Sequence, residues 1–470
     1  MGDSFHPSIT VIPPLTTPMS NLQDEAEQPL LSGIPEANLS HIDSAKRATS
    51  KSGRYRASAR IVGCCFSAAA AGWHDGCIGA LIPYLQLYYG VSDERVSLVF
   101  IGSFTGYILA SLLNVTLSNQ LGLGRLITLG AAIQGLASAI IAFRPPFIAI
   151  TMCYAVAGFG LAIQDAQFNT YIARLPGAET KLGIVHAIYG IGALSSPILA
   201  TLLMQAKIAP PVFYFTNVAW CFTSTISLSV GFGLSGSSLS DCQSQSAVES
   251  DEEIASLRTV VSSRAVWATL LFISLYTGTE TTEAGWVVSF LMRERDGGAL
   301  SGYASAAFYG GLTSSRVVLL PLTARLTEKR AVTLYAVIAL AMQVVVWNSP
   351  SFLVDLTAVA ACGFVMGPVY PVTVSLVTKA TPHGYHPGAL SLMACVGQSG
   401  SALFAFVVGS LADIYGIKVL QSVLVTLFVV MILLWLLVPS PQVRAHRSSL
   451  WPKPALIRED VNPPILYSSI

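Results

Sequence analysis

Long apolar runs separated by short polar breaks dominate the chain between about residues 61 and 439. A helix needs roughly 20 apolar residues to cross a bilayer. Runs of that length predict membrane-spanning helices at 61–89, 95–119, 123–143, 147–173, 182–206, 211–235, 265–291, 299–324, 331–348, 352–378, 386–412 and 417–439. Six runs precede a long polar segment and six follow it, so the pattern predicts an all-α membrane protein of twelve transmembrane helices.

The polar segments divide the chain into five parts. The pattern predicts a disordered tail at 1–55, a six-helix half at 56–235, a central loop at 236–264, a second half at 265–440 and a tail at 441–470. Lysine and arginine concentrate in the segments on the side of the termini, which places both termini in the cytosol. The plasma membrane is our default location, with the vacuolar membrane as the alternative.

The two halves align without a gap when the chain is shifted by 205 residues. The shift places Gly106 on Gly311, Gly158 on Gly363 and Arg125 on Arg330. It also places Asp75 on Glu280, and both acids lie inside apolar runs. Internal duplication with a site between the repeats is typical of secondary transporters. We therefore expect two pseudo-symmetric halves around a central site.

Composition excludes several classes of protein. Only 11% of the 470 residues are charged, against about 25% in soluble domains. A net charge of +1 gives no indication of nucleic-acid binding. The 8 cysteines have neither metal-ligand spacing nor the arrangement of a disulfide framework. We see no nucleophile–base set or phosphate loop, so we expect no enzyme, cofactor or metal.

Charged residues inside the apolar runs are the first functional candidates, because each costs at least ~2.5–3.5 kcal/mol in a bilayer core. We assign proton coupling to Asp75, Asp165 and Glu280, since a desolvated carboxyl can bind and release a proton. Arg316 is a candidate countercharge. Two alternatives remain. Asp75 could form a structural hydrogen bond between helices, and Arg316 could only neutralise a nearby acid.

Polar and aromatic neighbours complete the predicted site. Amides, hydroxyls and aromatic rings suit polyols and many drug-like ligands alike. The residues assigned to substrate binding are His74, Gln164, Asn169, His186, Tyr189, Glu283, Trp286, Arg316 and Gln398. Two alternatives without a role in substrate binding stay open. Glu283 could lie at the outer mouth of the bundle, and the aromatic residues could be anchors at the membrane interface.

Several motifs resemble the major facilitator superfamily. The loop at 118–125 is similar to that family's Gly/Asp/Arg signature, although its usual acid is missing, and 322–330 is its counterpart in the second half. Within the family, His74-Asp75 followed by Leu81-Ile82-Pro83 resembles the fucose permease branch and its fungal relatives. Asp165 followed four residues later by Asn169, and Glu280 followed by Gly285-Trp286, extend that resemblance. It implies the twelve-helix facilitator fold and assigns coupling and substrate binding to Asp75 and Asp165.

The leading hypothesis is proton symport of a small polar organic solute, with a sugar as one candidate, by alternating access. A second hypothesis is proton-driven export of a secondary metabolite or drug through the same acids. A third is a nutrient sensor that does not transport. The partners are then the solute, protons and membrane lipid, and we expect a monomer.

Overall fold

The computed structural model describes residues 36–233, 264–380 and 386–438. The chain forms two compact units, Met1–Ala57 and Ser58–Ile470, and the second contains the helix bundle. The segments 236–264 and 441–470, expected as loop and tail, lie almost wholly or wholly outside the described residues. Helix α1 (Glu36–Tyr89) begins inside the segment 1–55, for which the sequence predicts disorder.

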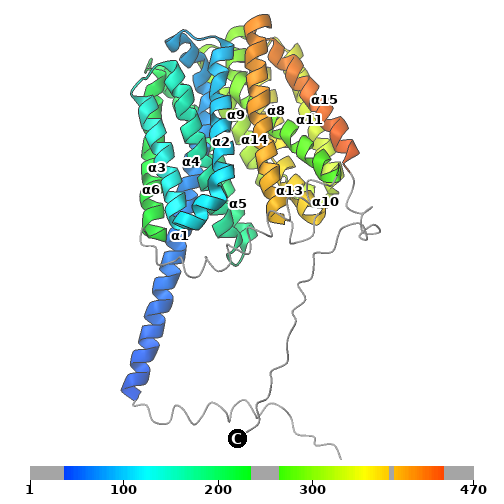
Figure 1. Cartoon of the computed structure of the whole chain (residues 1–470). Helices are drawn as coiled ribbons and strands as arrows, with labels where there is room; N and C mark the ends of the chain where they lie inside the picture. Colours follow the sequence, from blue (N-terminus) through cyan, green and yellow to red (C-terminus); the bar gives the residue numbers. More distant parts are fainter. Residues whose placement is uncertain (1–35, 234–263, 381–385, 439–470) are drawn as a thin grey trace, which may run out of the picture. The chain divides into compact units, whose positions relative to one another are not determined.

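Helices account for both halves (Figure 1). The first half contains α1, α2 (Asp93–Leu121), α3 (Leu123–Ala142), α4 (Phe147–Ala173), α5 (Ala178–Gln205), the short η1 (Pro210–Phe213) and α6 (Tyr214–Phe232). The second contains α8 (Arg264–Glu294), η3 (Gly298–Gly302), α9 (Tyr303–Val318), α10 (Leu320–Arg325), α11 (Glu328–Asn348), α12 (Phe352–Met366), α13 (Val369–Ala380), α14 (His386–Tyr415) and α15 (Val419–Leu437). Every predicted span coincides with a helix or with consecutive helical pieces.

The duplication seen in the sequence recurs in the helix boundaries. Helices α1 and α8 end at Tyr89 and Glu294, and α6 and α15 begin at Tyr214 and Val419, each pair 205 residues apart. The counterpart of α2 is broken into η3, α9 and α10. The counterpart of α4 is broken into α12 and α13 at Gly367-Pro368, because proline cannot donate the helical hydrogen bond.

The duplication also recurs in the contacts between helices. Gly106 of α2 lies against the carbonyl of Ala155 in α4, and Gly311 of α9 lies against the carbonyl of Ala360 in α12. These two pairs are related residue by residue by the same shift. Only glycine allows two helix backbones to approach so closely. The repeated glycines of the sequence are therefore the points where each half is packed.

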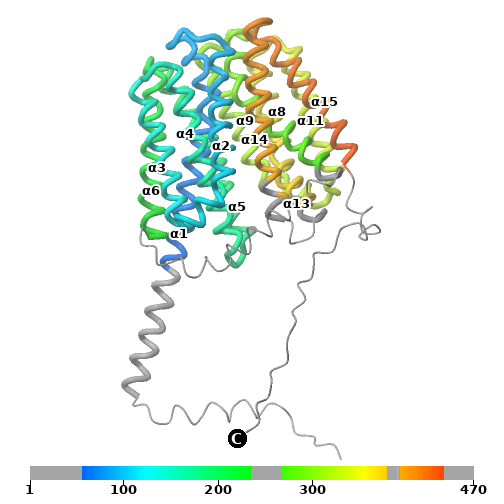
Figure 2. Tube along the Cα trace, viewed as in Figure 1, coloured from blue at the N-terminus to red at the C-terminus, as the bar shows by residue number. Residues whose placement is uncertain are grey.

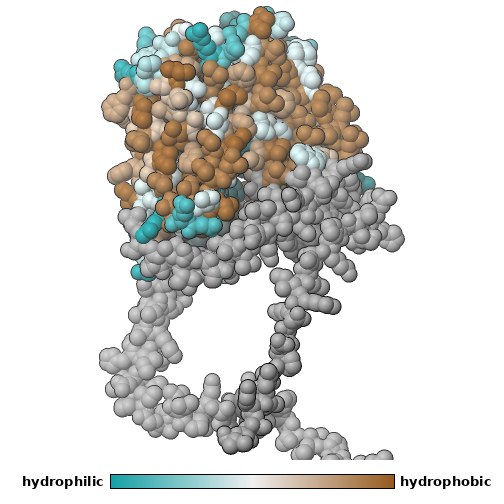
Figure 3. All heavy atoms as spheres, viewed as in Figure 1, coloured by the Kyte–Doolittle hydropathy of each residue, from teal (hydrophilic) through white to brown (hydrophobic). Residues whose placement is uncertain are grey.

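The outer surface of the bundle suits a bilayer. Eight helical stretches among the described residues are long and apolar enough to cross a membrane. On the face shown in Figure 3, apolar residues cover the middle of the bundle, and polar residues gather at the top and at the lower left. Exposed side chains such as Leu112, Met152 and Phe222 contribute to the apolar surface. Exposing so much apolar surface to water would be unfavourable, whereas contact with lipid chains is compatible with it.

The two halves pack against each other through several pairs of helices (Figures 1 and 2). Helix α2 packs on α14, and α5 packs on α9. Helices α1 and α8 meet at Gly79, which lies against the carbonyl of Ala284. Helices α1 and α8 carry Asp75 and Glu280, so the contact between the halves brings these two acids toward each other.

Candidate functional site: a group of carboxyls between the halves

Three carboxyls from both halves lie near one another at the centre of the bundle. Asp75 on α1 is close enough to Asp165 on α4 and to Glu280 on α8 for their charges to interact. All three are only partly buried. The structure thus brings together the three residues predicted for proton coupling.

Hydrogen bonds from phenols and an amide orient two of these acids. The Tyr189 hydroxyl of α5 donates to Asp75 Oδ2 at 2.8 Å. Asn169 Nδ2 donates to Asp165 Oδ1 at 3.1 Å, one helical turn away, and Tyr107 of α2 donates to Asp165 Oδ2 at 3.4 Å. Two predicted substrate residues, Tyr189 and Asn169, therefore contact the acids directly.

Two basic side chains face two of the acids. His186 of α5 is exposed and interacts electrostatically with Asp165 and with Arg316 of α9. Arg316 also interacts with Glu280. No ion pair within 4.0 Å joins either acid to its base among the residues described. These opposite charges therefore interact across a distance greater than that of a direct ion pair.

Four predicted substrate residues lie inside the halves instead. The exposed fractions of the residues are 2% for His74, 1% for Gln164, and 0% for both Glu283 and Trp286. Asn217 lies 3.3 Å from His74 Nδ1, and the Trp286 indole donates to the carbonyl of Ala405 at 2.9 Å. Their surroundings are those of packed core residues.

Glu283 is unusual even among these. Neither carboxyl oxygen has a hydrogen-bond partner, and Cys362 of α12 is a titratable neighbour. An ionised carboxylate in such a place would carry a large desolvation cost. By contrast, Gln398 of α14, the remaining predicted substrate residue, is exposed.

Sequence reasoning missed three tyrosines of the site. Tyr107, Tyr276 and Tyr309 all interact electrostatically with the central acids. The helical spacing offered a signal for Tyr276, which precedes Glu280 by four residues and so shares its face. Tyr309 likewise precedes Arg316 by seven. Nothing in the sequence indicated Tyr107.

A further polar group, also missed, joins the halves at one end of the bundle. Arg293 of α8 donates to both oxygens of Asp93 of α2, at 2.7 and 2.9 Å, and to Gln86 of α1 at 2.8 Å. Asp413 of α14 accepts from the Asp93 backbone N–H at 3.0 Å. We call Gln86, Asp93, Arg293 and Asp413 the clamp.

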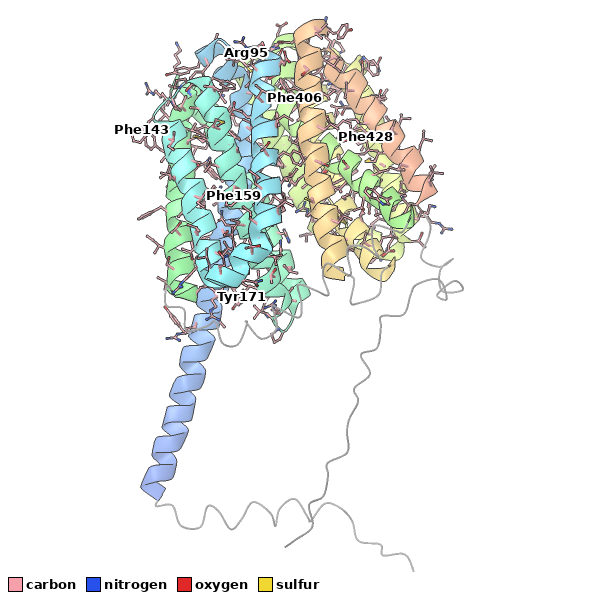
Figure 4. The ribbon with its side chains drawn as sticks, viewed as in Figure 1. Arg95, Phe143, Phe159, Tyr171, Phe406 and Phe428 are labelled. Carbon is pink, nitrogen blue, oxygen red and sulfur yellow. The ribbon has the colours of Figure 1, made fainter. Side chains whose placement is uncertain are left out.

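The clamp lies where α1, α8 and α14 end and α2 begins. Figure 4 labels Arg95, near the start of α2, at this end, and Tyr171, near the end of α4, at the other. All four clamp residues are therefore at the same end of the bundle, where the clamp links the two halves.

A duplicated helical bundle with lipid-compatible walls and central carboxyls defines a secondary membrane transporter. The sequence profile of the Major Facilitator Superfamily matches residues 64–354. The chain belongs to this family, as its motifs indicated, and is a multi-pass integral membrane protein rather than an enzyme.

Similar proteins come from yeast and bacteria. "Bypass of stop codon protein 6" of Saccharomyces cerevisiae is 27% identical over 410 residues, covering 81% of this chain and 82% of that protein. The "Multidrug efflux pump Tap" of Mycolicibacterium fortuitum is 24% identical over 390 residues, covering 75% and 89%.

Solved structures of the same family share the fold. The transporter FucP in its outward conformation has a TM-score of 0.57 and 15% identity, covering 81% of this chain and 98% of that one. A D-xylose-proton symporter has a TM-score of 0.64 and 11% identity, covering 82% and 98%. The twelve-helix facilitator architecture predicted from the sequence is thereby supported.

Proposed function

We propose that this protein is a proton-coupled transporter of a small polar organic solute, and that Asp75 carries the proton. The observation behind the proposal is a difference among the three central acids. Asp165 faces His186 and Glu280 faces Arg316. Among the described residues, Asp75 faces phenols, the Cys77 thiol and the two other acids, but no base. It is therefore the acid that a proton is needed to neutralise.

Charge balance gives this proton a role in the transport cycle. An uncompensated carboxylate in the middle of a membrane protein is costly, so the halves reorient most readily when Asp75 is protonated. Proton binding at one face and release at the other then drives the solute through the same central site. In this scheme the halves rock about the site, as in other transporters built from repeats.

Symport of a neutral polar solute is the first form of this proposal, with sugars as candidates. Asn169 and Tyr189 would contact a solute beside the acids, and Gln398 offers an exposed amide. Two proteins of the same fold are sugar–proton symporters by name. For location we propose the plasma membrane, with cytosolic termini and a monomer as the working unit.

Export by proton exchange is the second form. Its support is the burial of Gln164 and Trp286, which removes two of the groups expected to recognise a polyol. One relative is named a multidrug efflux pump. A solute that displaces the proton from Asp75 would move in the direction opposite to protons.

The test is flux driven by a pH gradient in proteoliposomes, with Asp75→Asn as the variant. Asparagine keeps the shape of the side chain but cannot exchange a proton, so we expect gradient-driven flux to be lost while solute exchange at equal pH persists. Asp296→Asn, a matched change at an exposed loop residue, should transport normally. Gradient-driven flux that survives in Asp75→Asn would overturn the assignment.

A further inference from the structure

Two of the side chains expected to recognise a polyol, Gln164 and Trp286, are instead hydrogen-bonded inside the protein. Gln164 accepts from Ser67 at 2.7 Å, and its amide nitrogen donates to Gln134 at 2.8 Å and to the carbonyl of Gly160 at 3.1 Å. Trp286 is fully buried, with its indole N–H bonded to a backbone carbonyl. Neither residue has a free donor or ring face for a sugar.

Phenols and carboxyls remain at the centre. Each of five tyrosines interacts electrostatically with at least one of the central acids, and they come from five helices of both halves. They are Tyr107 of α2, Tyr189 of α5, Tyr276 of α8, Tyr309 of α9 and Tyr370 of α13. We call these five residues the phenol ring.

Most hydroxyls of the phenol ring are already bonded. Tyr189 and Tyr107 donate to Asp75 and Asp165, and Tyr276 donates to the carbonyl of Met366 at 3.1 Å. The rings of Tyr276 and Tyr370 lie 6.3 Å apart and are tilted by 43°. Tyr107, Tyr189 and Tyr370 are only partly buried, so their aromatic faces can meet a ligand, whereas Tyr276 and Tyr309 are buried.

When its three carboxyls are ionised, the site carries an excess of negative charge. Asp75, Asp165 and Glu280 oppose one permanent cation, Arg316, together with His186. Aromatic faces and carboxylates are both attractive to a positive charge, and rings of aromatic side chains are a known means of binding organic ammonium groups. A neutral polyol would leave this negative charge unbalanced.

We propose that the central site binds an organic ammonium cation within the phenol ring, where it competes with protons for the carboxyls. This inference rests on the proposed proton-coupled function and narrows its solute class. The groups facing Asp75 are Asp165, Glu280, Tyr154, Tyr189 and Tyr309 from other helices, and Cys77 from its own. None of them supplies a fixed positive charge, so either a proton or the ligand must do so.

The experiment is calorimetric titration of the purified full-length protein with tetramethylammonium, tetraethylammonium and 1-methyl-4-phenylpyridinium. These ions keep their charge at every pH, so any pH dependence belongs to the protein. We expect saturable binding of at least one ion, weakening at least tenfold between pH 7.5 and 5.5, and unaffected by excess D-glucose or L-fucose.

Variants of Tyr370 test the aromatic contact. Removing one cation–π contact should weaken binding about tenfold in Tyr370→Ala, whereas Tyr370→Phe keeps the ring and should bind normally. Tyr303→Ala, at the start of α9 and outside the phenol ring, is the matched control and should also bind normally. Equal binding by Tyr370→Ala and the wild type would overturn the proposal.

The remaining outcomes separate this proposal from the proposed function. If none of the three ions binds but a pH gradient drives hexose uptake that Asp75→Asn abolishes, the ammonium assignment is wrong and proton coupling stands. If an ion binds with loss of affinity in Tyr370→Ala but equally at both pH values, the ammonium site stands. Proton competition at the carboxyls is then wrong, and the exchange form of the proposed function fails with it, whereas symport through Asp75 stands.

Discussion

Among the described residues, the Tyr189 hydroxyl of α5 donates a side-chain hydrogen bond to Asp75 of α1. A hydroxyl that donates to a carboxyl stabilises the charged form over the protonated form. The Tyr189 hydroxyl therefore helps Asp75 to release its proton. This role differs from that of Asn169, whose partner Asp165 already faces His186.

Replacing Tyr189 by Phe removes that donor and keeps the ring. One hydrogen bond to a charged group contributes about 1.5 kcal/mol, so we expect the half-maximal rate of gradient-driven flux to move upward by about one pH unit. The measurement is the pH profile of transport. Tyr84→Phe, on α1 away from the acids, is the control, and an unchanged profile in Tyr189→Phe would contradict the role.

The buried carboxyl of Glu283 is expected to behave differently from that of Asp75. Because its carboxyl is fully buried without a hydrogen-bond partner, it is expected to hold its proton throughout the cycle. Glu283→Gln should therefore fold with a melting temperature close to that of the wild type and should transport normally. Thermal unfolding and flux measure the two effects. Loss of flux in a well-folded Glu283→Gln would instead make this residue a proton carrier.

At the scale of the elements, paired glycines determine how α2 packs on α4 and how α9 packs on α12. A methyl group on Gly106 or Gly311 would collide with a backbone carbonyl of the facing helix. Backbone cannot yield as a flexible side chain can, so both helices would have to move apart. The two halves should respond alike because the contacts are equivalent.

We expect Gly106→Ala and Gly311→Ala each to destabilise the protein by about 1–3 kcal/mol, read as a lower melting temperature in detergent. Gly183 of α5 provides the control, because a methyl group there would meet nothing within 4 Å. Gly183→Ala should be neutral or slightly stabilising, since alanine favours the helix. Similar destabilisation at all three positions would show that close packing is not the cause.

The helices were largely predictable from the sequence, but the side of each helix that faces the centre of the bundle was not. Run length predicted each span, and the shift of 205 residues predicted the repeat, because both depend on hydrophobicity and glycine spacing alone. The burial of Glu283 was not predictable from that pattern. In a helix apolar on nearly every side, periodicity does not distinguish the face toward the other half from the face inside its own. Glu280 and Glu283 lie only one turn apart, yet they fall on opposite sides of that boundary.

At the scale of the whole molecule, the clamp joins four helices from both halves at one end. Arg293 bonds to Asp93 and Gln86 across the two halves. If the halves rock about the central site, as we propose, these bonds must break when this end opens, and the clamp would stabilise the conformation described here relative to the opposite one. The side chain of Asp93 is only 9% exposed, which makes its loss of a partner costly.

Arg293→Ala should shift the population toward the conformation open at the clamp end. Double electron–electron resonance between spin labels at Glu94 of α2 and Tyr415 of α14, both exposed, should then report a longer distance. Lys418→Ala is the control, because Lys418 pairs with Glu294 at 3.4 Å within one half. Identical distance distributions in wild type and Arg293→Ala would remove the clamp from the mechanism.

The contacts of Gly106 with Ala155 and of Gly311 with Ala360 also record the history of the chain. A single six-helix ancestor, duplicated and fused, explains why the same pairs recur at one offset. The polar positions diverged after that event: Asp165 now corresponds to Tyr370, and Arg316 to Ser111. The places where backbones touch match between the two copies, whereas the polar side chains between them differ, so a symmetric scaffold carries an asymmetric set of central side chains.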